Sequence, residues 1–259
     1  MKSVLILGSS SLLASRLHHH LHLHSVPVST ISLRPYLDDD IYLSSLRPIL
    51  ESHDVIFNFC GPNSSQLQAQ PSLGKLLHQH VPSCLLQASR ESGSTYYQIS
   101  SYHSVSEVLV SGNIASPFDC KPISIYASSN NKLERILFST DRSPDNYIIR
   151  ISNCFGPPSP AANFSPKHWM TISNSFAYSI ALGTRIIIDS PQLIRPFLPT
   201  LCFLNFCLSI VDGTYVHTNS SNVIQLISPF EISLESMFNY QQIIFADAST
   251  VSATEYLFE

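Results

Sequence analysis

Short apolar runs alternate with stretches of helical periodicity along most of the chain. The first run, Val4–Leu7, ends at Gly8 and three serines, after which leucines recur at helical spacing through Leu21. A strand, a tight turn and a helix in this order predict the opening of a βαβ unit. Similar runs predict further strands at 26–33, 54–61, 95–101 and 146–152, and helices at 41–52, at 66–91 with breaks at Pro71 and Pro82, and at 122–138.

Beyond residue 157 the pattern loosens. We expect a helix at 165–182, a short strand at 184–189, an extended segment at 194–199, a strand at 223–227 and a helix at 233–245. The apolar stretch 201–211 fits a helix or a strand, and its length does not decide between them. The alternation as a whole predicts an α/β fold with a doubly wound parallel sheet.

Composition excludes several classes of function. The 259 residues include 14 basic and 18 acidic side chains, for a net charge of −4, and they form no basic stripe that would bind nucleic acid. The apolar run before Gly8 is too short for a signal peptide, and 201–211 is too short to span a membrane. Six cysteines without a C-x-x-C pair fit a reducing compartment. We therefore expect a soluble cytoplasmic protein with no nucleic-acid or membrane partner.

A histidine-rich stretch, RLHHHLHLH, ends the first predicted helix. His20 and His24 are one turn apart, a spacing that can hold a metal ion, but no carboxylate or cysteine accompanies them. The alternative is that both lie on the outer face of the helix. We predict no metal site here.

The first turn favours a dinucleotide. Gly8, Ser11 and Ala14 are three residues apart where strand meets helix, and the N–H groups of such a helix can hold a pyrophosphate. Small residues in this pattern also serve close packing alone. Ser32 and Arg34, after the second strand, suit a 2′-phosphate better than the free ribose hydroxyls of NAD. The sequence thus favours NADP, with NAD possible and a solvated Arg34 as the alternative.

Four motifs stand in one order: GSSSLLA at 8–14, DVIFNFCG at 54–61, QISS with Tyr126 downstream, and RISNCFGP at 150–157. This ordered set resembles the extended short-chain dehydrogenase/reductases, the NAD(P)-dependent epimerase/dehydratase family. The resemblance implies a Rossmann-like domain over 1–160 and a small, reduced substrate-binding lobe over 161–259 that is interleaved with the last sheet elements. It also implies a set of cofactor-binding residues: Gly8, Ser10, Ser11, Leu12, Arg34, Cys60, Gly61 and Ser100.

The resemblance also implies catalytic residues. Ser101 matches the family's Ser or Thr, and Tyr126 matches the tyrosine of Y-x-x-x-K, a general acid/base. A phenol ionises near pH 10, and the family's lysine helps it through its charge. Here Asn130 replaces that lysine, and Lys132 falls about 240° round the helix from Tyr126. The alternative reading of Tyr126 is an ordinary aromatic on a helix face.

On the substrate side, the resemblance places Asn153 and Arg195 at a nucleotide-sugar pyrophosphate; a surface arginine before a strand is the alternative for Arg195. Tyr102 and His103 stand where dehydratases carry an Asp-Glu pair, which favours a 4-keto reductase or an epimerase in polysaccharide synthesis. A dinucleotide-binding sensor or partner subunit with impaired catalysis is the rival hypothesis. Pairing into a homodimer is expected through helices 66–91 and 122–138, whose outer faces are predicted to carry leucines and an isoleucine: Leu76, Leu77, Leu85, Leu86, Leu133 and Ile136.

Overall fold

A six-stranded parallel sheet forms the centre of the molecule. The computed structural model describes residues 2–33, 41–105, 116–139, 146–156, 172–217, 222–228 and 231–248. The strand order is β2-β1-β3-β4-β5-β8, and every neighbouring pair is parallel. The strands are β1 (Val4–Leu7), β2 (Val28–Ile31), β3 (Val55–Asn58), β4 (Thr95–Ser101), β5 (Asn146–Ile151) and β8 (Val223–Leu226). The predicted doubly wound parallel sheet is confirmed.

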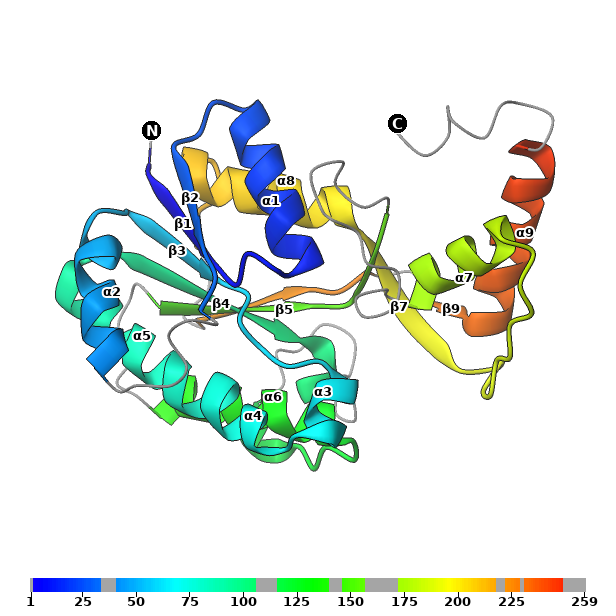
Figure 1. Ribbon diagram of the computed structural model, residues 1–259, viewed down its shortest axis with the longest axis horizontal. Helices are drawn as coiled ribbons and strands as arrows, with labels where there is room; N and C mark the ends of the chain where they lie inside the picture. Colours follow the sequence, from blue (N-terminus) through cyan, green and yellow to red (C-terminus); the bar gives the residue numbers. More distant parts are fainter. Residues whose placement is uncertain are drawn as a thin grey trace.

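Helices cover both faces of the sheet (Figure 1). Every residue of β1 and β3 is buried, as expected of parallel strands with continuous apolar runs. Side chains from one face pack with α1 (Leu12–Leu23) and α8 (Thr200–Asp212). The other face packs with α2 (Ile41–Glu51) and α5 (Val81–Ser92), and α6 (Ile125–Ser139) lies beside α5. The stretch 201–211, ambiguous in sequence, is therefore helical.

The predicted breaks at two prolines have different outcomes. After α3 (Ser64–Ala69) the backbone leaves the helical region at Gln70, so the break before Pro71 is confirmed. A short α4 (Ser72–Lys75) then passes into η2 (Leu76–His80), a π-helix that continues directly into α5. The predicted break at Pro82 is wrong, because the helical backbone runs on from η2 through Pro82 into α5.

Three residues that were expected on outer helix faces are buried instead. Leu85, Leu86 and Leu133 have 2% of their surface exposed or less. Leu85 and Leu86 pack in the core that α5 shares with α2 and β1. The prediction of an apolar outer surface is wrong at these positions, because α2, α5 and α6 pack against one another as well as against the sheet.

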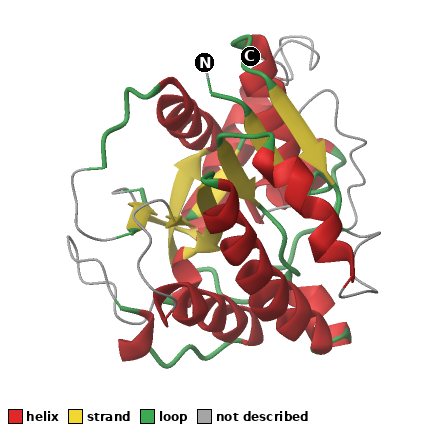
Figure 2. Ribbon diagram, turned by 90° about the vertical axis from the view of Figure 1, so that its left-hand side faces the viewer, coloured by secondary structure: helices red, strands yellow, loops and turns green. Residues whose placement is uncertain are grey.

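A smaller unit extends beyond the main sheet, at the right of Figure 1. It consists of a three-stranded sheet, β6 (Asn153–Phe155), β7 (Ile194–Pro199) and β9 (Glu231–Ser233), with α7 (Ile172–Ala181) and α9 (Leu234–Ala248). Phe176, Phe197, Leu234 and Met237 form its buried core. Figure 2 shows the layers from the side.

One predicted strand of this region is wrong. Residues 184–188 have no regular structure, and Ile187 is 75% exposed. The apolar run there pairs with no strand in the two described sheets, and without a partner it gains no ladder hydrogen bonds. Within the described part of the chain, no helix combines the length and apolar character needed to cross a membrane.

Candidate active site

The predicted dinucleotide turns meet where the strand order reverses. β1 pairs with β2 on one side and with β3 on the other, so the chain winds away in both directions from this point. Ligands of open α/β sheets bind at the carboxyl ends of the strands at such a switch. Gly8 follows β1 with φ +87°, and a Cβ there would lie 3.0 Å from the amide nitrogen of Cys60. Only glycine combines this backbone angle with so close an approach.

The first helix starts immediately beyond this turn. Ser11 precedes α1 in an extended conformation, and its own side chain makes no capping bond to the helix. The N–H groups in the first turn of α1 therefore receive no capping bond from Ser11. Ala14, in the same turn, is fully buried against the sheet. Ser10 is exposed at the tip of the turn, with Leu12 beginning the helix beside it.

The remaining residues around the turn have separate surroundings. The amide of Gly8 donates to the Ile31 carbonyl at 2.9 Å, which places the end of β2, and Ser32 after it, beside the turn. Arg34 lies outside the described residues. Burial raises the pKa of the Cys60 thiol to about 12, so this side chain packs as a neutral group. Gly61 next to it is exposed.

The predicted catalytic residues come together at the end of β4. Burial raises the pKa of Tyr126, while hydrogen bonding to the side chains of Ser101 and Asn130 lowers it. The Asn130 amide also donates to the backbone carbonyl of Tyr126 at 3.0 Å. Lys132 is exposed, and none of the influences on Tyr126 comes from a charged side chain of the described residues. The phenol is therefore protonated near neutral pH.

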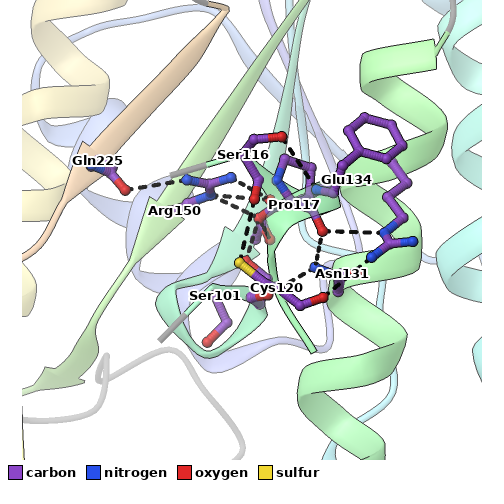
Figure 3. A network of polar contacts seen from close by, with 12 residues as sticks. Ser101, Ser116, Pro117, Cys120, Asn131, Glu134, Arg150 and Gln225 are labelled. Carbon is purple, nitrogen blue, oxygen red and sulfur yellow. Dashed lines mark hydrogen bonds and ion pairs between the residues drawn. The ribbon is translucent and has the colours of Figure 1, made fainter. Parts of the chain in front are cut away.

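A buried ion pair anchors the same helix (Figure 3). Glu134 and Arg150 are both fully buried, and the guanidinium Nη2 lies 2.7 Å from the carboxylate Oε2. Arg150 also donates from Nη1 to Gln225 Oε1 on β8 at 3.2 Å. The ion pair thus ties α6 to β5 and β8. This ion pair was not predicted from the sequence.

Glu134 also fixes the segment that contains Ser101. Ser100 donates to Oε1 at 2.6 Å, and Ser104 donates to the same oxygen at 2.7 Å. Ser100 directly precedes Ser101 at the end of β4, and Ser104 is the last residue of the 3₁₀ helix η3 (Tyr102–Ser104) that follows Ser101. Ser100, predicted to bind cofactor, is 4% exposed and has its hydroxyl committed to this carboxylate. Glu134 on α6 therefore holds the residues on both sides of Ser101, and so positions Ser101 relative to Tyr126 on the same helix.

The predicted substrate residues lie next to η3. Asn153 Nδ2 is 3.5 Å from the Tyr102 hydroxyl and 3.4 Å from the Pro196 carbonyl on β7. Burial raises the pKa of Tyr102, and the charge of Arg195 lowers it. Burial and then the charge of Arg195 lower the pKa of His103 to about 4. Asn153 and Arg195 are thus brought together beside two aromatic residues.

His103 is the functional candidate that sequence reasoning missed. Its ring lies against that of Tyr102 at an angle of 39°, with centroids 4.2 Å apart, and meets Tyr126 edge-on at 6.2 Å. With a pKa of about 4 it is a neutral imidazole, able to donate at one nitrogen and accept at the other. Its position two residues after Ser101 could have indicated that it lies at the site. In the sequence analysis this position is used only as an argument against a dehydratase.

Comparison with solved structures finds the same fold in known proteins. The UDP-glucose 4-epimerase of Thermotoga maritima, solved with UDP-glucose, matches with a TM-score of 0.75 at 14% identity, over 94% of this chain and 82% of the epimerase. The fold is that of nucleotide-sugar 4-epimerases. The chain also matches the UDP-glucose 4-epimerase of Thermus thermophilus in complex with NAD, with a TM-score of 0.70 at 14% identity, over 96% and 83% of the two chains.

A third match has a different substrate name. The UDP-N-acetylglucosamine 4-epimerase of Methanobrevibacter ruminantium, in complex with UDP-N-acetylmuramic acid, gives a TM-score of 0.72 at 18% identity, over 97% of this chain and 83% of that one. No protein-family model matches the sequence, and no curated protein matches it. The predicted resemblance to the extended short-chain dehydrogenase/reductases is confirmed at the level of the fold.

Proposed function

We propose that this chain is an NAD(P)-dependent enzyme that reduces or epimerises a nucleotide-activated sugar at its 4-position, in the cytoplasm, for polysaccharide synthesis. The observation that carries the proposal is the meeting of Ser101, Tyr126 and Asn130 at the end of β4, next to the switch point of the sheet. The epimerases of the same fold, solved with NAD or a UDP-sugar, support the class of cofactor and of substrate.

The switch point fits a dinucleotide. The close approach of Gly8 to Cys60 leaves backbone instead of side chain along the turn, and the start of α1 has N–H groups for a pyrophosphate. Gly8, Ser10, Ser11 and Leu12 would hold the phosphates, with Cys60 and Gly61 in the turn after β3 and Ser32 with Arg34 at a 2′-phosphate. When bound, the cofactor supplies or accepts hydride.

The protein's own part is proton transfer and orientation. Tyr126, protonated near neutrality, donates its hydroxyl proton to a sugar carbonyl, and Ser101 and Asn130 orient that hydroxyl. Asn153 and Arg195 bind the diphosphate of the nucleotide, for which a guanidinium fork is well matched. We assign substrate binding to the small unit of β6, β7, β9, α7 and α9, in which β6 precedes the predicted boundary at residue 160 and the other elements follow it. Because Tyr126 has no charged neighbour among the described residues, reduction is favoured over oxidation.

The test is activity with defined substrates. Purified chain is given NADPH or NADH with a UDP-4-keto sugar, and NAD with UDP-glucose or UDP-galactose, and both nicotinamide absorbance and sugar products are followed. Turnover of any of these supports the proposal. Binding of the dinucleotide without any turnover contradicts it and favours the sensor or partner subunit.

The cofactor preference has its own measurement. Arg34→Ala should weaken NADPH binding by roughly 1.5–3 kcal/mol, the size of a lost charge-assisted contact, and leave NADH binding unchanged. Equal dissociation constants for the two cofactors in both proteins would contradict the preference. The homodimer stays a prediction, and light scattering at micromolar concentration tests it; Leu76, Leu77 and Ile136 are the partly buried candidates for its interface.

A further inference from the structure

A buried histidine outside the predicted site contacts both halves of it. His78 lies in the π-helix η2 and is 3% exposed. Its ring nitrogen Nδ1 is 2.8 Å from the hydroxyl of Ser129, the residue before Asn130 on α6. On the other side of the ring, Nε2 lies so close to Gly61 that a Cβ on this glycine would overlap it. One imidazole therefore contacts the turn after β3 and the helix that carries Tyr126.

The geometry of η2 directs this side chain. A π-turn accommodates an extra residue and turns its side chains away from the direction that a regular helix would give. Leu76 and Leu77 on the same turn pack with the core under the sheet, while His78 reaches α6. Gly74, one turn earlier, leaves room for the same serine: a Cβ there would lie 2.8 Å from Ser129 Oγ. Ser129 is thus held between Gly74 and His78.

The histidine is neutral. Burial lowers its pKa to about 4, so at neutral pH one ring nitrogen donates and the other accepts. The hydroxyl of Ser129 can pair with Nδ1 in either tautomer, because a hydroxyl both donates and accepts. The ring therefore acts through contact and hydrogen bonding, without a charge.

We propose that His78 is a positioning residue that couples the dinucleotide-binding turn at Gly61 to the α6 segment with Tyr126 and Asn130. A close-packed ring between two elements transmits a displacement of one to the other, because neither side has space to absorb it. Binding of a dinucleotide at the turn would then fix the position of α6, and with it that of Tyr126. The inference rests on the proposed function for its effect on turnover.

Binding of NADH, followed by its fluorescence, gives a test that needs no turnover. Gly61→Ala places a methyl group against the ring and should weaken NADH binding by at least about tenfold, because ring and turn must separate. His78→Ala removes the obstacle and should itself stay within about threefold of wild type. The double variant Gly61→Ala/His78→Ala should then recover to the level of His78→Ala. A double variant that binds as weakly as Gly61→Ala alone would overturn the coupling.

Turnover gives the second test. His78→Leu and Ser129→Ala should each lower kcat by about tenfold with KM changed less than about twofold, and the double variant should be no worse than the poorer single one. His78→Asn, which keeps a hydrogen-bonding group near Nδ1, should restore most of kcat. Matched controls are His80→Leu, exposed on the same turn, and Ser128→Ala, next to Ser129. Additive losses, or a change in KM with kcat intact, would contradict the positioning role.

The two proposals fail separately. If wild-type protein binds NADH but converts no nucleotide sugar, the proposed function is wrong, and the rescue of Gly61→Ala by His78→Ala still decides whether His78 couples the two elements. If turnover is present and the rescue is absent, the function stands and the coupling is wrong.

Discussion

The two halves of α6 treat their polar side chains in opposite ways. Towards the carboxyl end, the charge of Glu134 is fully buried and is matched by Arg150 and two serine hydroxyls. Towards the amino end, Tyr126 meets the neutral side chains of Ser101 and Asn130. A buried charge needs a partner because its desolvation costs several kcal/mol, whereas a buried phenol avoids that cost by keeping its proton. The first half of the comparison concerns stability, and the second concerns chemistry.

The largest effect should follow from breaking the ion pair. Glu134→Gln leaves the Arg150 guanidinium buried without its counter-charge, and we expect a loss of about 3–5 kcal/mol in the free energy of unfolding. Urea denaturation followed by circular dichroism measures it. Arg47→Met is the control, since the pairs of Arg47 with Glu51 at 2.8 Å and with Glu91 at 3.0 Å are exposed and should contribute far less. Equal losses in both variants would show that burial does not distinguish the pairs.

The amino-terminal half should respond in rate and not in stability. Tyr126→Phe removes the hydroxyl that donates the proton, and we expect kcat for reduction to fall at least about a hundredfold while the unfolding midpoint changes little. Single-turnover oxidation of NADPH with a UDP-4-keto sugar measures the rate. A variant that keeps the wild-type rate would remove Tyr126 from the reaction.

Supplying the missing charge sharpens the comparison further. Asn130→Lys places an ammonium one turn from Tyr126 and should lower the pKa of the phenol, since a nearby cation favours the phenolate. Oxidation of an alcohol substrate should gain at least about tenfold at neutral pH, because one pKa unit corresponds to about 1.4 kcal/mol. In wild type the same step should rise with pH up to the elevated pKa of Tyr126. A flat pH profile together with no gain in Asn130→Lys would contradict the assignment.

The smallest effect concerns acid stability. His78 has a pKa of about 4 in the folded chain, below the usual value, so the unfolded chain binds its proton first as the pH falls. Stability should therefore be intact at neutral pH and decline between about pH 6.5 and pH 4, with His78 contributing about 1 kcal/mol of loss by pH 5.5. Urea midpoints across this range, compared between wild type and His78→Asn, measure the difference. Parallel curves would show that His78 is not the group responsible.

Much of the fold could be predicted because strands and helices have distinct periods. The buried strands β1 and β3 could be predicted because each is a continuous apolar run that ends in small residues. Two of these small residues, Gly8 and Cys60, do pack together. The strand at 184–189 was wrong because an apolar run does not reveal whether a partner strand lies beside it. Likewise, the spacing of Leu85 and Leu86 could not show that α2 would cover them.

The site was predictable where the motif residues are neighbours in sequence. Tyr126 and Asn130 are one helical turn apart, so their proximity follows from the helix itself. The contacts of His78 with Gly61 and Ser129 join three segments through the tertiary fold, and no local pattern encodes them. The pairing of Arg150 with Glu134 could not be predicted for the same reason. The position of Arg150 in a buried strand gave no indication of which carboxylate it would contact.

The connectivity of the last sheet strand has a consequence for how the chain folds. β8 pairs with β5 in the register Ile148 to Val223, after the chain has left the sheet to form β6, α7, β7 and α8. The pairing must close a long loop, and such non-local contacts slow folding because the entropy of loop closure is lost before the contact is gained. During synthesis, one edge of β5 therefore stays unpaired until residue 226 has left the ribosome. Only then can Gln225 form its hydrogen bond with Arg150. The hydrogen bond between Arg150 and Gln225 thus forms late, and an emerging chain would carry an exposed strand edge for longer than the order of its first five strands suggests.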